Sequence, residues 1–180
     1  LYLVGMMGSG KSKTGPYLSQ ALGYKFIDVD DEIEKATQVS ISDIFNDQGE
    51  STFRELESQV LKEIGLRHSF VVATGGGLVT HSKNWGTLHQ GVVIWIDPGR
   101  NRLLLRLKSD KTIRPLLATN KPETAFDELF KQRESIYLQS DLHIKVADES
   151  PEEVSLIILH QLNLLINKKA DLGESQTIGD

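Results

Sequence analysis

The chain has 180 residues, a quarter of them charged, with a formal net charge of −5 at pH 7 and no cysteine. The length fits one domain, the lack of cysteine excludes disulfides and thiolate metal sites, and the short apolar runs argue against a membrane span. The acidic balance argues against binding to nucleic acid or to a membrane surface, so an anion-binding function needs cations concentrated at particular positions.

Short apolar segments alternate with helical patterns along the chain. The expected strands are 1–4, 24–27, 70–74, 91–96 and 142–146. The expected helices are 11–22, 32–36, 41–46, 51–66, 101–107, a stretch ending near 137, and 151–166. Because most of these strands read as apolar runs rather than as an alternation of apolar and polar residues, and because they alternate with helices, they predict an α/β fold with a mainly parallel sheet covered on both faces. In such folds the functional groups lie where the strands end.

The first expected strand runs into the phosphate-binding pattern Gly5-x-x-x-x-Gly10-Lys11-Ser12, with a helix directly after it. Glycines let successive backbone N–H groups converge on phosphate oxygens, and the helix N-terminus adds its positive end. Lys11 is expected to reach the β- and γ-phosphates, and Ser12 to ligate Mg²⁺. An ordinary glycine-rich turn with a surface lysine is the alternative. The nucleotide-binding residues expected here are Gly8, Ser9, Gly10, Lys11, Ser12 and Lys13.

Two aspartates follow the second expected strand, beside this loop. Asp28 and Asp30 are separated by one residue, so one carboxylate can support Mg²⁺ through water while the other orients a hydroxyl and accepts its proton. The alternative is structural: Asp30 or Asp31 caps the following helix, and Asp28 ends the strand. The residue types alone leave both interpretations open.

Candidate acceptor-site residues come next along the chain. Arg54 and Glu57 lie three apart on one helix face, either as a solvated ion pair or with Glu57 aiming the guanidinium at a carboxylate substrate. The consecutive glycines Gly75, Gly76 and Gly77 predict close approach of a ligand or of another chain segment, with a plain loop as the alternative.

Two further arginines belong to the C-terminal half. Arg114 lies in a largely polar segment between helices, and a mobile segment with one arginine suits a lid over a triphosphate. An ordinary exposed loop is the alternative. Arg133 either serves the site or pairs with Glu128 or Glu134 on its own helix.

In chain order, these motifs resemble the shikimate kinase family over about residues 1–166. The similarity rests on GMMGSGKS from Gly5, FIDVD from Phe26, SISDIFNDQGESTFRELE from Ser40, TGGGLV from Thr74, RPLL from Arg114 and QRESIY from Gln132. A phosphate-binding loop occurs in many families, whereas the ordered set is highly specific. The segments at 84–85 and 91–95 look most like those of cyanobacterial and plant-plastid members.

The resemblance implies transfer of the ATP γ-phosphate to the 3-hydroxyl of shikimate, on the route to chorismate and aromatic amino acids. ATP is the implied co-substrate and Mg²⁺ the implied cofactor. The implied fold is the nucleoside-monophosphate-kinase-like P-loop fold, with a five-stranded parallel sheet between helices and a mobile lid.

The resemblance also assigns roles to residues that match the family motifs. Asp30 matches the aspartate that holds the substrate hydroxyl and is the candidate base. Asp28 matches the Mg²⁺-associated aspartate and completes a metal-binding set with Ser12. Arg114 matches the lid arginine, which contacts nucleotide and joins Lys11 as a catalytic residue. The implied substrate-binding residues are Asp30, Arg54, Gly76 and Arg133.

A domain organisation is implied as well. One kinase domain spans 1–167, with a substrate-binding segment at about 30–64, a lid at about 108–122, and a disordered tail at 168–180. The implied partners are shikimate and ATP, bound to a monomer that engages neither nucleic acid nor membrane. The expected location is the bacterial cytoplasm, or the plastid stroma if an N-terminal segment was removed.

Some residues depart from the family pattern. Lys13 stands where Thr or Ser is usual, which removes a hydroxyl and places a cation near the α-phosphate or in solvent. Pro16 predicts a kink in the helix after the loop. Arginines that clasp adenine in some members, near Leu107 and Glu149, are absent. The alternatives to shikimate kinase are a related hydroxy-acid kinase, for example one acting on gluconate, and a non-catalytic binding protein.

Overall fold

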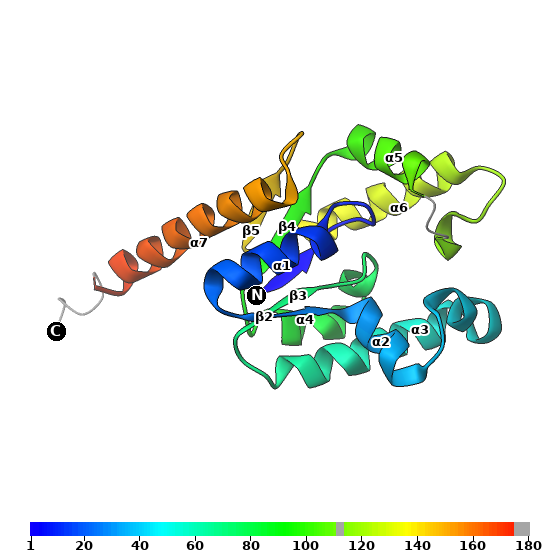
Figure 1. Cartoon of the computed structure of the whole chain (residues 1–180), viewed down its shortest axis with the longest axis horizontal. Helices are drawn as coiled ribbons and strands as arrows, with labels where there is room; N and C mark the ends of the chain where they lie inside the picture. The colour runs from blue at the N-terminus through cyan, green and yellow to red at the C-terminus, as the bar shows by residue number, and fades with distance from the viewer. Residues whose placement is uncertain (111–113, 175–180) are drawn as a thin grey trace.

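The computed structural model describes residues 1–110 and 114–174, with the backbone alone for 169–174. At its centre is a five-stranded sheet in the order β2-β3-β1-β4-β5, in which neighbouring strands are parallel (Figure 1). The strands are β1 Tyr2–Val4, β2 Lys25–Asp28, β3 Phe70–Ala73, β4 Val93–Asp97 and β5 Leu142–Lys145. The predicted α/β fold with a parallel sheet is confirmed.

Helices cover both faces of this sheet (Figure 1). On one face α1 (Lys11–Leu22) packs against α7 (Pro151–Glu174). The remaining helices are α2 Val29–Thr37, α3 Ile41–Gly65, α4 Ser82–Leu88, α5 Arg100–Ser109 and α6 Pro122–Tyr137, with short 3-10 turns η1 Leu78–Thr80 and η2 Pro115–Leu117.

Side chains that alternate along β1 enter two separate cores. Leu3 packs with Leu18 of α1 and Ile158 of α7, whereas Tyr2 and Val4 join the core formed with α3, α4 and α6. Because both faces of the sheet are covered, the residues of the inner strands β1 and β3 are apolar whichever face they occupy. This explains their continuous apolar runs, whereas the edge strands β2 and β5 also carry exposed polar residues.

Some helices have the bounds that the local pattern predicts and others do not. Helix α1 spans the expected residues and runs through Pro16, where the sequence predicts a kink. Gly49 (φ 81°, ψ 170°) interrupts helical geometry within α3, between the two helical stretches expected there. Helix α7 extends to Glu174, past the expected end at 166 and into the segment 168–180 expected to be a mobile tail. The last residues of that segment, 175–180, lie outside the described part of the chain.

Helix α4 has no counterpart among the expected elements. Two side-chain hydrogen bonds fix it to the turn before it: Asn84 Nδ2 donates to the Leu78 carbonyl and Trp85 Nε1 to the Val79 carbonyl, each at 2.9 Å. These bonds are made to η1 and do not follow from helical periodicity, so a pattern search misses the helix.

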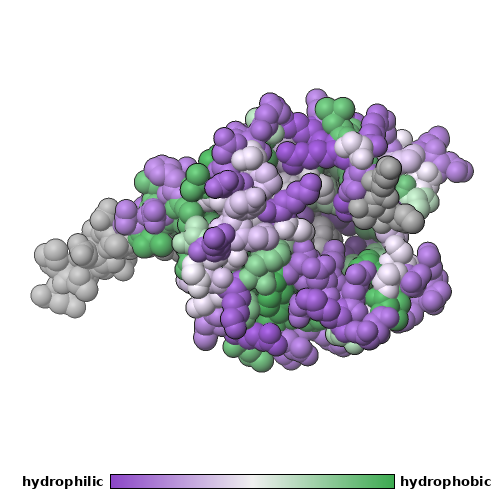
Figure 2. Space-filling view, in the orientation of Figure 1, coloured by the Kyte–Doolittle hydropathy of each residue, from purple (hydrophilic) through white to green (hydrophobic). Residues whose placement is uncertain are grey.

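The strand ends bring the predicted functional loops together. In the sheet Leu3 is paired with Ala73, and Ala73 with Asp28, so the segments that follow β1, β2 and β3 begin side by side. Figure 2 shows a mainly hydrophilic surface that is hollowed between the α2–α3 side and the α5–α6 side of the molecule. In the described part of the chain, no helix has the length and apolar character needed to cross a membrane.

Candidate active site

The loop between β1 and α1 is shaped to hold an anion. Gly8 (φ 79°) and Gly10 (φ 100°) take left-handed backbone conformations that side chains disfavour, and a Cβ on Gly5 would lie 2.6 Å from the Ile96 carbonyl oxygen. Gly10 immediately precedes α1, and no side chain caps this helix end. The free N–H groups and the positive end of the helix dipole are therefore available to a phosphate.

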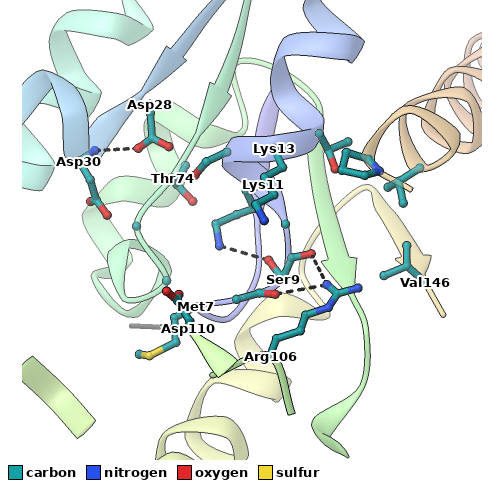
Figure 3. Close-up of a pocket in the computed structure, with 18 of the residues that line it drawn as sticks. Met7, Ser9, Lys11, Lys13, Asp28, Asp30, Thr74, Arg106, Asp110 and Val146 are labelled. Carbon is teal, nitrogen blue, oxygen red and sulfur yellow. Dashed lines mark hydrogen bonds between the residues drawn. The ribbon is translucent and has the colours of Figure 1, made fainter. Parts of the chain in front are cut away.

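Lys11 folds over this loop and is buried. Its Nζ donates hydrogen bonds to the carbonyls of Gly5 (2.8 Å) and Met6 (3.0 Å). A third bond goes to the Ser9 hydroxyl (3.2 Å) (Figure 3). Burial lowers the pKa of Lys11 to about 8, with the Asp30 carboxylate acting in the opposite direction. The alternative of a surface lysine on an ordinary turn is wrong.

The two aspartates at the end of β2 and the start of α2 differ in what their side chains contact. Asp28 caps α2, because its Oδ1 accepts a hydrogen bond from the Asp30 backbone N–H at 3.0 Å (Figure 3). The Asp30 carboxylate is uncommitted, and its buried Oδ1 has no hydrogen-bond partner among the described residues. Burial first, then the charge of Asp28, raises the pKa of Asp30 to about 6. Asp28 ends β2 as the structural alternative expected, but the alternative is wrong about the cap, because Asp28 and not Asp30 or Asp31 caps α2. Asp30 can accept a proton at neutral pH.

Arg54 and Glu57 form a buried pair, so the solvated alternative is wrong for them. Arg54 Nη1 donates to Glu57 Oε2 at 2.5 Å, and the two side chains are 9% and 0% exposed. The Nε and Nη2 atoms of Arg54 donate to Glu50 Oε1 at 3.2 and 2.8 Å. Burial raises the pKa of Glu57 to about 7 despite the attraction of Arg54.

Two of the three consecutive glycines leave no room for a side chain. A Cβ on Gly75 would lie 2.0 Å from Glu57 Oε1, and one on Gly77 would lie 2.4 Å from the Arg54 guanidinium. The predicted close approach of another chain segment is confirmed for these two positions. The glycines allow the buried ion pair of α3 to lie directly against the loop after β3.

Arg133 on α6 is buried with donors unused. It is 3% exposed, and its Nε and Nη1 have no hydrogen-bond partner among the described residues. No salt bridge within the described chain joins it to Glu128 or Glu134. Tyr137, one turn further on, donates its hydroxyl to the Gly76 carbonyl at 2.6 Å and ties α6 to the glycine loop. A buried guanidinium with free N–H groups is a site for an anionic ligand.

Arg114 directly precedes η2 at the mouth of the site. Its Nη2 donates to Asp110 Oδ2 at 2.7 Å, and its buried Nε has no partner among the described residues. Residues 111–113 of the lid expected at about 108–122 lie outside the described part of the chain.

Two adjoining cavities collect the predicted residues. The larger, of about 670 Å³, is lined by the loop after β1 and by Ser12, Lys13 and Asp28 (Figure 3). The smaller, of about 290 Å³, contains Arg54 and Arg133. The residues that line both are Met7, Asp30, Gly75, Gly76 and Arg114. Asp30 therefore lies at the junction of a phosphate-binding cavity and a cavity with two arginines.

The residues on the larger cavity fit a magnesium ion that phosphates help to hold. In the described chain no group of three or more His, Cys, Asp or Glu could bind a metal by itself. Mg²⁺ in phosphoryl-transfer sites takes few protein ligands and completes its shell with phosphate oxygens and water. Ser12, which is exposed at the helix start, and Asp28 supply oxygen ligands of this kind.

The sequence motifs do not predict two contacts that shape the site. Arg106 on α5 lines the larger cavity and donates from Nη1 to the Gly8 carbonyl (3.3 Å) and the Ser9 carbonyl (3.5 Å) of the phosphate loop (Figure 3). No local signal in the sequence connects residues so far apart. Glu50 lies four residues before Arg54, a spacing typical of helical ion pairs that could have revealed the contact.

Comparison with known proteins gives one consistent result. The family model described as shikimate kinase matches residues 7–163. A curated shikimate kinase from Prochlorococcus marinus strain MIT 9211 is 60% identical over 178 residues, covering 99% of this chain and 90% of that protein.

Solved structures agree with this match. A shikimate kinase from Acinetobacter baumannii in complex with shikimate superposes with a TM-score of 0.85 at 36% identity, covering 89% of this chain and 90% of that one. A shikimate kinase from Aquifex aeolicus gives a TM-score of 0.78 at 37% identity, covering 94% and 96% of the two chains.

Proposed function

The chain belongs to the shikimate kinase family, and from that membership we propose which residues transfer the γ-phosphate of ATP to the 3-hydroxyl of shikimate. The chain is an ATP-dependent kinase that forms shikimate 3-phosphate and ADP. The observation that supports the proposed roles most directly is the position of Asp30, which lines both the cavity with the phosphate loop and the cavity with two arginines.

The triphosphate binds in the larger cavity. Backbone N–H groups of Gly8, of Gly10 and of the first turn of α1 donate to the β-phosphate, while the Ser9 N–H stays bonded to the Met6 carbonyl. Lys11 exchanges its bonds to loop carbonyls for the β- and γ-phosphates, whose charge favours its protonated form. Lys13 is exposed on the same cavity and contacts the α-phosphate in place of the usual hydroxyl.

Ser12 and Asp28 would hold Mg²⁺ together with the phosphates. When bound, the ion would supply positive charge to the phosphate oxygens during transfer. Asp28 keeps its hydrogen bond to the Asp30 backbone N–H, so it also fixes the backbone from which the Asp30 side chain extends.

Shikimate binds in the smaller cavity through its carboxylate and hydroxyls. Arg133 donates to the carboxylate with its unpartnered N–H groups, and Arg54 donates from the opposite helix. Gly76 contributes backbone contacts to the substrate. These contacts direct the 3-hydroxyl toward Asp30 and the larger cavity.

Asp30 accepts the proton of the 3-hydroxyl as the oxygen attacks the γ-phosphate. With its pKa raised to about 6, it is ionised at neutral pH and is a stronger base than an exposed aspartate. Arg114, on the boundary between the cavities, stabilises the transferring phosphoryl group when the segment at about 108–122 covers the site.

The catalytic unit is one chain, because every residue in these roles comes from the same domain. We place that domain at 1–167, with the substrate-binding segment at about 30–64. The partners are two small molecules, without nucleic acid or membrane. The location is the cytoplasm of a bacterium, or the plastid stroma if the chain derives from a plastid enzyme.

A coupled assay of ADP release with Mg·ATP and shikimate tests the activity. Shikimate-dependent turnover well above the ATPase background is expected, with removal of Mg²⁺ by chelation abolishing it. Turnover with gluconate and not shikimate in a substrate panel would favour the related hydroxy-acid kinase. Nucleotide binding by calorimetry without any turnover would favour the non-catalytic alternative.

A further inference from the structure

Arg54 is already bound by two carboxylates in the substrate-free site, and the two are not equivalent. Glu57 is fully buried and holds Nη1. Glu50 is 49% exposed, and a single oxygen of it, Oε1, accepts from both Nε and Nη2. This Nε/Nη2 edge is one of the two edges through which a guanidinium binds a carboxylate in bidentate fashion. Glu50 thus occupies the position that a substrate carboxylate needs on that edge.

The orientation of Arg54 does not depend on Glu50. Glu57 fixes one end of the guanidinium from a fully buried position, and the guanidinium lies against Gly77, where a Cβ would come within 2.5 Å of its carbon and both Nη atoms. These two contacts hold the group in place without help from a half-exposed side chain. The contact from Glu50 then acts mainly as a competitor for the donors.

Glu50 is also placed where it can move away. It follows Gly49, the residue with non-helical backbone (φ 81°, ψ 170°) inside α3, and a Cβ on Gly49 would meet nothing within 4 Å. Glu50 therefore begins the second helical stretch of α3, where the positive end of the helix dipole favours a carboxylate that has turned to solvent. The cost of releasing it from Arg54 is correspondingly small.

The charges around the cavity favour such an exchange. The smaller cavity is lined by the arginines Arg54, Arg114 and Arg133 and by the carboxylates of Asp30, Glu34 and Glu57. Glu50 adds a further carboxylate beside Arg54, and a substrate carboxylate bound to Arg54 is repelled by it. Of the two carboxylates bound to Arg54, Glu50 is the half-exposed one and so the less costly to return to water.

We infer that Glu50 is a displaceable stand-in for the substrate carboxylate: it occupies the Nε/Nη2 edge of Arg54 and leaves when a carboxylate ligand binds. The inference rests on the proposed function, in which Arg54 binds the carboxylate of shikimate. Glu50 lowers the affinity of the site for shikimate, because the substrate carboxylate must displace it. A polyol without a carboxylate cannot displace Glu50 and therefore gains no contact with Arg54. It is a specificity-determining residue for this site.

The test is the equilibrium affinity for shikimate, measured by calorimetry and compared with KM and kcat, in Glu50→Gln and in the matched control Glu55→Gln. Glu55 is exposed on the same helix, and its substitution removes the same charge. We expect Glu50→Gln to bind shikimate about fivefold more tightly with kcat unchanged, as fits a half-exposed ion pair. Glu55→Gln should behave like the wild type. Weaker or unchanged binding by Glu50→Gln would overturn the inference, because it would make Glu50 a positioning residue or a bystander.

Two further measurements distinguish the direct contact of Glu50 with Arg54 from a general effect of the negative charge of Glu50. Glu50→Asp keeps the charge on a shorter side chain that cannot span both nitrogens, so it should bind shikimate as tightly as Glu50→Gln. Wild-type affinity in Glu50→Asp, with tighter binding in Glu50→Gln, would show long-range repulsion and overturn displacement. Methyl shikimate, which has no carboxylate, should gain less than twofold from Glu50→Gln; an equal gain for ester and acid would also overturn it.

The proposed function fails separately from this inference. A wild-type protein without shikimate-dependent turnover contradicts the proposed roles whatever Glu50 does. A wild type that turns over shikimate, together with a Glu50→Gln variant that binds it no more tightly, contradicts only the stand-in role.

Discussion

At the scale of single residues, the site contains charged groups with buried atoms that lack partners. Asp30 has an unpartnered oxygen and Arg133 two unpartnered nitrogens, whereas Lys11 donates to two carbonyls and a hydroxyl but has no anionic partner among these contacts. The unpartnered atoms cost free energy in the empty protein, because a buried charge without a partner is poorly solvated. Each becomes favourable when a ligand of the right charge arrives, which is how preorganised sites stabilise transition states.

Replacing Asp30 by Asn tests the base at this scale. The amide keeps the size of the side chain and cannot accept the hydroxyl proton, so kcat should fall by roughly 10²–10⁴-fold. The fold should survive, because the hydrogen bond to Asp28 is made by the Asp30 backbone. The control is Asp31→Asn, an exposed neighbour whose kcat should stay near the wild-type value. A kcat within threefold of wild type in Asp30→Asn would refute the assigned role.

Replacing Arg133 by Ala tests the carboxylate contact. Loss of charge-assisted hydrogen bonds should raise KM for shikimate by roughly 10–100-fold and leave KM for ATP nearly unchanged. Arg133→Lys should recover only part of the loss, because an ammonium has no planar fork. Lys131→Ala, at an exposed position of the same helix, is the control in steady-state kinetics. An unchanged KM for shikimate in Arg133→Ala would place the carboxylate elsewhere.

At the scale of elements, the sequence predicts the order of strands and helices well, and it predicts their ends less well. The five strands and α1 follow from apolar runs, glycine turns and helical spacing that are all local. Helix α4 does not, because it is held by bonds from Asn84 and Trp85 to a neighbouring turn. The local sequence also does not indicate why residue 15 has to be glycine. A Cβ on Gly15 would lie 2.1 Å from the Phe26 ring on the adjacent strand β2.

The loop after β3 gives a prediction about element packing. In Gly75→Ala the new methyl group would lie 2.0 Å from Glu57 Oε1, so the buried pair of α3 must shift. We expect a loss of about 1–3 kcal/mol in the free energy of unfolding, together with weaker shikimate binding. Gly86→Ala is the matched control, because its Cβ would meet nothing within 4 Å on helix α4. It should gain about 0.5–1 kcal/mol through helix propensity. Chemical denaturation of both variants measures the difference, and equal effects would contradict the packing argument.

At the scale of the whole molecule, the site is assembled from segments far apart in the chain. The sequence names Asp30, Arg54 and Arg133 only as separate candidates, each with a structural alternative, and it is the resemblance to a family that groups them. Their relation to each other depends on the parallel register of the sheet and on the packing of α3 and α6, which no local pattern contains. The contact between Glu50 and Arg54 is another case that the sequence predicts only in part. Helical spacing permits an ion pair between them, but it does not indicate that Arg54 also has to bind a ligand.

Because folding buries carboxylates in this site, the stability of the ligand-free protein depends on pH. Burial raises the pKa of Glu57 from 4.5 to about 7 and that of Asp30 from 3.8 to about 6, so the folded chain binds these protons more tightly than the unfolded chain. Their contribution to stability is full below the unfolded values and is lost as the pH rises through about 6 to 7. The free protein should therefore melt at a higher temperature at pH 5.5 than at pH 8.

Calorimetric or fluorescence-monitored melting without nucleotide, metal or shikimate measures this dependence. Glu57→Gln should flatten it, because the amide has no proton to lose between pH 5.5 and 8. Saturating shikimate should raise the melting temperature at pH 8, because binding to the folded state alone stabilises it and the occupied Arg54 and Arg133 then balance a full set of carboxylates. A free protein that is more stable at pH 8 than at pH 5.5, with Glu57→Gln showing the same slope, would contradict the burial of these carboxylates as the cause.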